Sequence, residues 1–144
     1  MEQDILTKGT VPGVRVYALR TTNLVREAAK QHNCSHLASA ALGRAMNGAL
    51  LLAATMKDNE RITLRFKGDG PIGEVVADAE GTHVRGYVEN PDVFLPLKNG
   101  KLDIGDFAIF QLAVTGKGFG VLQVTSNDNV TFTDGTANIQ LAIF

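Results

Sequence analysis

The chain has 144 residues, of which 44% are hydrophobic and 20% are charged. This is the length of one ordinary domain, and it suffices to bury a hydrophobic core without disulfides or metals. Because 14 basic residues balance 15 acidic ones, the formal net charge is −1, and no bulk field attracts nucleic acid or an anionic membrane. The sequence begins without the apolar run of a signal peptide, and its one cysteine is typical of a reducing compartment. We therefore expect a single domain, residues 1–144, in the cytoplasm.

The first predicted strand, Val14–Arg20, follows a Pro-Gly turn. Thr21 or Thr22 can cap the helix that comes next, which runs to about His32 and carries one apolar stripe.

A longer helix is predicted over residues 36–56, with Ser35 as its N-cap. It is apolar over most of its circumference, so we expect it to be buried on several sides. Arg44 and Asn47 interrupt the apolar run before it reaches the roughly 18 residues that a membrane span needs. Small residues keep one face of the helix thin, which lets another element approach closely: Ala38, Ala41, Ala45, Ala49 and Ala53.

From Arg61 onward the hydrophobic period changes from 3.6 to 2, and Arg61–Lys67 has the alternation of a half-buried strand. Further strands are predicted at residues 74–79, 83–88, 107–114, 119–125, 130–133 and 139–144. Because these strands follow one another without intervening helices, the predicted fold class is α+β, a mainly antiparallel sheet with a helical hairpin packed on one face.

Residues 67–73, KGDGPIG, are rich in glycine, as phosphate-binding loops are. Such loops lead from a strand into a helix whose N-terminus faces the anion. A predicted strand follows here, so we favour a tight turn in which Gly68, Gly70 and Gly73 supply positive φ angles.

Cys34 lies two residues from His32 and two from His36, which leaves open a nucleophile–base pair or a metal site. A zinc site normally needs four ligands, and a nucleophile needs an orienting third group. The sequence indicates neither, so we favour a helix junction and expect no catalytic residues and no metal. A small Cys/His-based enzyme remains one alternative.

A second alternative is a nucleic-acid-binding domain that uses the strand from Lys57 to Lys67, where basic side chains could bind phosphates. Acidic residues interleave with these basic residues, and the aromatic partners typical of single-strand binders are missing. A solvated sheet face is the favoured interpretation.

Five motifs occur in order along the chain: TTNLVREA at 21–28, ASAALGR at 38–44, KGDGPIG at 67–73, VRGYVENP at 84–91, and LPL with GKLDIG between 95 and 105. Together they resemble the N-terminal domain of the redox-regulated 33-kDa heat-shock chaperone family of bacteria. The resemblance covers residues 12–105 well and is weak after residue 126.

The resemblance implies an ATP-independent holdase of the stress response, which binds unfolding client proteins and forms a homodimer. It implies zinc only in a C-terminal domain with four cysteines, whereas this sequence has one cysteine, so we expect no cofactor here. Nucleic acid and membranes are not expected partners.

A holdase needs exposed apolar surface rather than a catalytic centre. The candidate client-binding residues are Phe94, Phe107, Ile109, Phe110 and Phe119. The alternative is that these side chains fill the core.

Overall fold

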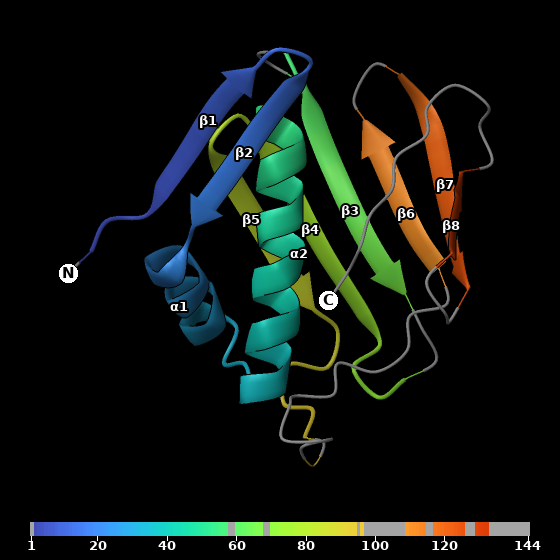
Figure 1. Cartoon of the computed structure of the whole chain (residues 1–144). Coiled ribbons are helices and arrows are strands. Elements are labelled where there is room, and N and C mark those ends of the chain that lie inside the picture. The colour runs from blue at the N-terminus through green and yellow to red at the C-terminus, as the bar shows by residue number, and fades with distance from the viewer. Residues whose placement is uncertain are drawn as a thin grey trace.

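The computed structural model describes residues 2–57, 60–67, 70–94, 96, 109–114, 117–125 and 129–132, and for the last three ranges it describes the backbone alone. It contains two helices, α1 (Thr22–Gln31) and α2 (His36–Ala54), and two antiparallel sheets (Figure 1). The strands are β1 (Ile5–Val11), β2 (Val14–Arg20), β3 (Arg61–Lys67), β4 (Glu74–Glu80), β5 (His83–Val88), β6 (Ile109–Val114), β7 (Lys117–Thr125) and β8 (Asn129–Phe132). The α+β class predicted from the sequence is confirmed.

The larger sheet has the order β5-β4-β3-β6-β7-β8, and every neighbouring pair in it is antiparallel. In β3, Ile62 and Leu64 are almost fully buried, whereas Arg61 and Arg65 are exposed. The alternation in the sequence therefore separates a core face of the sheet from a polar face.

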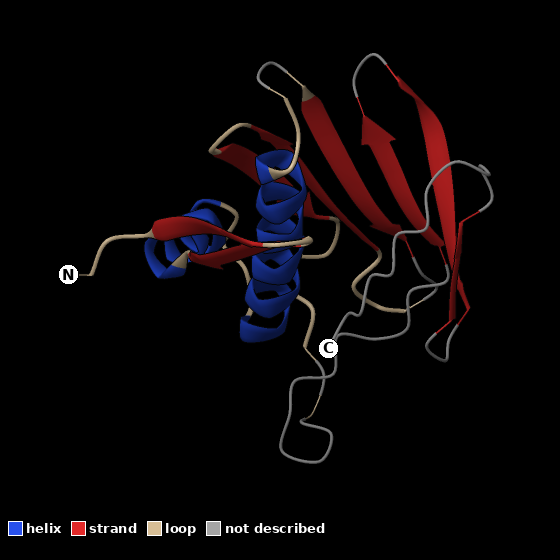
Figure 2. Ribbon diagram, turned by 45° about the horizontal axis from the view of Figure 1, so that its top comes forward, coloured by secondary structure: helices blue, strands red, loops and turns tan. Residues whose placement is uncertain are grey.

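Helix α2 lies between this sheet and a two-stranded ribbon formed by β1 and β2 (Figures 1 and 2). It packs on β3, β4 and β5, while β2 and α1 contact it from other sides. Ten of its 19 residues are buried, which confirms the expectation of burial on several sides. By length and composition α2 is apolar enough to cross a bilayer, but here its apolar residues form the protein core.

Two glycines, one in α2 and one in β5, allow neighbouring elements to lie close to α2. A Cβ at Gly43 would lie 2.8 Å from Cγ1 of Val25 in α1. In β5, a Cβ at Gly86 would lie 2.7 Å from the carbonyl oxygen of Val76 and 2.9 Å from Cδ1 of Leu42. The five alanines of the thin face predicted on α2 are all buried, and Gly86 is a further site of close approach, on the strand that the helix covers.

Strand β1 is absent from the sequence-based prediction. Its segment ILTKGTV mixes two threonines, a lysine and a glycine with three large apolar residues, so neither face shows a clear apolar period. It forms because it pairs along its whole length with β2, from Ile5 opposite Arg20 to Val11 opposite Val14. Gly13 has φ of 79° in the connecting turn, as the Pro-Gly pair predicts.

Two later strands begin before their predicted starts, β7 at Lys117 rather than residue 119 and β8 at Asn129 rather than residue 130. The first two residues of the strand predicted at 107–114 and the last residue of that at 130–133 lie outside the described residues. The strand predicted at residues 139–144 lies outside the described residues.

Candidate functional site

Phe94 is the one candidate client-binding residue whose side chain is described, and it is 83% exposed. It follows Val93, which is 8% exposed and belongs to the core. Ser35 holds this segment, because its N–H donates to the carbonyl of Pro91 at 2.6 Å and its hydroxyl donates to the carbonyl of Val93 at 2.5 Å. An aromatic side chain on a firmly attached segment is therefore exposed.

The other four candidates stay predictions. Phe107 lies outside the described residues, and only the backbone is described for Ile109 and Phe110 in β6 and for Phe119 in β7. The register places Phe110 opposite Phe66 of β3.

A second apolar surface was missed by the sequence-based prediction. The pairing of β1 with β2 puts Ile5, Val11, Val14 and Val16 on one face of the ribbon, and each of these side chains is more than half exposed. We call these four residues the ribbon face. The alternation in Val14–Arg20 was the available signal, but the face is complete only when β1 contributes its half.

The residues before β1 attach the ribbon to helix α1. Asp4 accepts hydrogen bonds from the backbone N–H groups of Asn23 (3.0 Å) and Leu24 (2.8 Å). Arg20 binds the carboxylate of Glu2 at 2.9 Å. A carboxylate at a helix N-terminus satisfies unpaired N–H groups and opposes the helix dipole, so Asp4 caps α1 from a distant position in the sequence.

Thr21 occupies the N-cap position of α1 but its side chain makes no capping hydrogen bond. Its hydroxyl instead donates to the side-chain oxygen of Asn47 at 2.5 Å. The predicted capping position is therefore confirmed, whereas the capping group comes from Asp4. The bond also explains a polar residue in the middle of α2, because Asn47 ties that helix to the β2–α1 junction.

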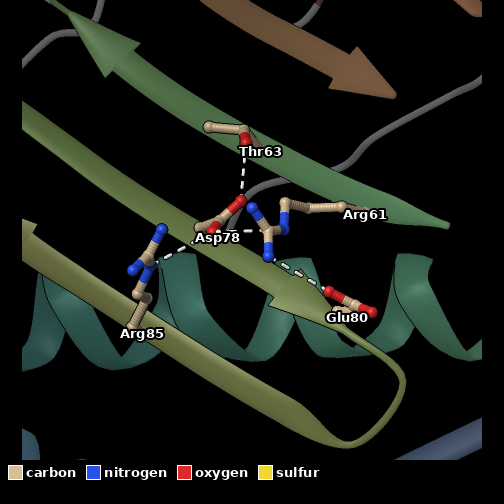
Figure 3. A network of polar contacts seen from close by, with 5 residues as sticks. All are labelled: Arg61, Thr63, Asp78, Glu80 and Arg85. Carbon is tan, nitrogen blue, oxygen red and sulfur yellow. Dashed lines mark hydrogen bonds and ion pairs between the residues drawn. The ribbon is translucent and has the colours of Figure 1, made fainter. Parts of the chain in front are cut away.

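The polar face of the large sheet carries a network of charges centred on Asp78, whose side chain is 16% exposed (Figure 3). Asp78 accepts from the hydroxyl of Thr63 at 2.8 Å and from Nε of Arg85 at 3.1 Å. Arg61 lies 3.8 Å from Asp78 and 3.2 Å from Glu80.

A similar pairing occurs farther along β3, where Arg65 and Glu74 are 2.6 Å apart. Acidic partners thus neutralise the arginines of the strand on which the nucleic-acid alternative depends. This geometry favours the interpretation of a solvated sheet face, because a phosphate would have to displace these carboxylates.

Cys34 is partly buried and packs against the core, next to the exposed His32 and His36. Burial raises the pKa of the Cys34 thiol, because the charged thiolate is poorly solvated there. A nucleophilic cysteine needs a lowered pKa. The local backbone matches a helix junction instead, with Asn33 at φ of 51° and the N–H of Cys34 bonded to the carbonyl of Ala29 at 2.8 Å.

The described part of residues 67–73 forms a turn between β3 and β4, as favoured from the sequence. Gly73 has φ of 75°. The carboxylate of Glu89 accepts the N–H of Glu74 at 2.8 Å, and the amide of Asn90 donates to the carbonyl of Pro71 at 2.9 Å. Side chains from the VRGYVENP motif therefore brace the glycine turn, so two of the five motifs meet in one structural unit.

The family model of the Hsp33 protein matches residues 4–141 of the chain, which includes β1 and extends beyond residues 12–105 at both ends. The 33 kDa chaperonin of Picosynechococcus sp. is 48% identical over 122 residues, covering 81% of this chain and 38% of that protein. That of Thermus thermophilus is 52% identical over 97 residues, covering 65% and 28%.

A crystal structure of the 33 kDa chaperonin (heat shock protein 33 homologue) of Thermotoga maritima has the same fold. It matches with a TM-score of 0.76 and 37% identity, over 83% of this chain and 45% of that one. The chain thus spans less than half the length of these three proteins.

Proposed function

Because this chain belongs to the Hsp33 family, we propose that it is the core of an ATP-independent holdase, which binds unfolding proteins in the cytoplasm. The family match over residues 4–141 carries this proposal. Exposed apolar side chains support it, since Phe94 and the ribbon face offer contact area to non-native chains.

The proposal assigns this chain no catalytic step and no cofactor of its own. The raised pKa of Cys34 argues against a thiolate enzyme. The paired arginines of β3 argue against a phosphate-binding surface. The partners that we propose are unfolded clients and a second copy of the chain, because the terminal strands of a sheet favour pairing or covering.

The test is light scattering of a heat-denatured client, with this 144-residue chain pre-treated by reductant or by peroxide. With one cysteine the chain cannot form an intramolecular disulfide, so we expect equal suppression of aggregation under both conditions. A Cys34→Ser variant is the matched control for oxidation of the thiol. A large activation by peroxide that survives in this variant would contradict the expected independence from oxidant, and no suppression under either condition would contradict the function.

Two further measurements test the partners and the metal. Static light scattering should give the mass of a dimer, and a monomer would count against self-association. Elemental analysis should find no stoichiometric zinc. One tightly held zinc per chain would instead revive a site at His32, Cys34 and His36.

A further inference from the structure

The ribbon face concentrates exposed apolar surface on a small part of the fold. Among the described residues six large hydrophobic side chains are exposed, and four of them are Ile5, Val11, Val14 and Val16, with exposures of 51%, 59%, 53% and 54%. The opposite side of the ribbon is different, because Leu6, Tyr17 and Leu19 are partly buried there, where β2 lies against α2. The ribbon thus uses one side to attach to the protein and leaves the other in water.

In the described part of the chain, the ribbon also has edges without a strand partner. Among the described strands β1 and β2 pair only with one another, so each keeps one edge whose backbone N–H and C=O groups have no strand partner. Figure 1 shows β2 nearer to α2 and β1 farther out. Such an edge accepts an extended peptide as an additional strand, and every second side chain of that peptide then lies on the ribbon face.

The positive charge of the ribbon favours an acidic binding partner over a second copy of the chain. Between Ile5 and Arg20 the chain carries Lys8, Arg15 and Arg20 and no acidic residue, although the whole chain has a net charge of −1. Lys8 and Arg15 are exposed near the turn, and Arg20 is paired with Glu2 at the other end. A second copy docked through the same ribbon would bring like charges together, whereas an acidic segment would be attracted.

We propose that the outer edge of β1 captures an extended segment of a non-native protein, in which alternating apolar residues are flanked by acidic ones. The segment adds as a third strand, its apolar side chains lie on the ribbon face beside Ile5 and Val11, and an acidic residue on its other face lies near Lys8. This inference rests on the proposed holdase function and names the surface that a client would occupy.

The probe is a fluorescent peptide of the sequence Glu-Val-Thr-Val-Thr-Val-Glu, and its binding is measured by fluorescence anisotropy. The double variant Ile5→Thr/Val11→Thr changes the two ribbon-face residues of β1, the strand that the peptide would join. It keeps β-branched side chains but removes apolar contact, and it should weaken binding about tenfold. Tyr87→Thr is the control, because Tyr87 is 43% exposed on the polar face of the other sheet, and it should bind as the unaltered chain does. Circular dichroism melting checks that both variants are folded.

Two peptide variants separate strand addition from simple apolar contact. A peptide with N-methyl groups on alternate residues cannot donate along one edge, so it should lose most of its binding. A peptide with lysines in place of both glutamates should also bind more weakly, and this difference should shrink at high salt.

The contrary results either overturn the proposal or assign the ribbon face to another partner. No peptide binding by the unaltered chain, equal binding by the double variant, or equal binding by the N-methylated peptide would overturn the proposal. Loss of a dimer in the double variant would assign the ribbon face to a second copy. Adsorption to anionic phospholipid vesicles that the double variant abolishes, without peptide binding, would assign it to membranes.

Aggregation suppression by the same samples distinguishes this proposal from the function on which it rests. If the unaltered chain suppresses aggregation but the ribbon does not bind the peptide, the holdase function stands and the client lies elsewhere, for example at Phe94. If the ribbon binds the peptide but aggregation is not suppressed, the peptide site stands and the holdase function fails.

Discussion

Replacing Gly86 with alanine should destabilise the protein, because β5 lies close to both β4 and α2 at this residue. The added Cβ would lie 2.7 Å from the backbone oxygen of Val76, and 2.9 Å from Leu42 and 3.3 Å from Met46 on α2. The oxygen belongs to the neighbouring strand β4, so it cannot move aside as the end of a flexible side chain would. Overpacking of this kind costs about 2–3 kcal/mol, toward the upper part of the usual range.

An opposing effect reduces this cost, because alanine loses less conformational entropy than glycine, a gain of about 0.5–1 kcal/mol. The net loss is then about 1–2.5 kcal/mol. With about 2.1 cal/mol/K of unfolding entropy per residue, 144 residues give about 0.3 kcal/mol/K. We therefore expect Tm in a calorimetric scan to fall by about 3–8 °C.

Gly9→Ala is the matched control. Gly9 is also in a strand, but a Cβ there would meet no atom within 4 Å. Only the entropy gain applies, so Tm should stay the same or rise by about 2–3 °C. If Gly86→Ala were as stable as the unaltered chain, β5 would be able to shift away from α2, and the close approach would not be what requires glycine.

Three further outcomes are expected. Asp4→Ala should lower the free energy of unfolding by about 0.5–2 kcal/mol in urea titrations, because α1 loses its capping carboxylate, and an unchanged midpoint would show that water replaces the cap. Alkylation of Cys34 by iodoacetamide at neutral pH should be slower than that of free cysteine, because the raised pKa leaves less thiolate. The alkylation rate should increase as the pH approaches this pKa, and a rate above that of free cysteine would indicate an activated thiol. Asp78→Ala should cost about 1–3 kcal/mol, because Thr63 and Arg85 lose their acceptor, and Asp78→Asn should recover part of this loss if hydrogen bonding rather than charge dominates.

The elements with a strong hydrophobic period were predictable from the sequence. The alternation of Arg61–Lys67 and the apolar circumference of α2 both indicate which side chains are buried. Burial of these side chains stabilises the two elements. Strand β1 was not predictable in the same way, because it is exposed on most of its length and forms through pairing with β2. Its partner is set by the turn at Gly13, which the sequence did indicate.

Of the exposed apolar residues, only Phe94 was predicted, because the ribbon face depends on contacts that are not local in the sequence. Phe94 lies shortly after the VRGYVENP motif and could be predicted as a candidate from the sequence; its side chain is exposed. The ribbon face needs two strands in one register before its four residues lie together. The cap of α1 is equally nonlocal, since Asp4 is far from Leu24 along the chain. A local pattern contains no information on such contacts.

The cap that Asp4 provides has a consequence for folding order and local motion. Helix α1 has ten residues, and none of them is buried, so it would be marginal as an isolated helix. Its N-terminal turn is completed only after β1 has folded back on β2 and delivered Asp4. The ribbon and α1 should therefore open and close as one cooperative unit, with amide hydrogen exchange in Val25 and its neighbours reporting on a hairpin that they do not belong to.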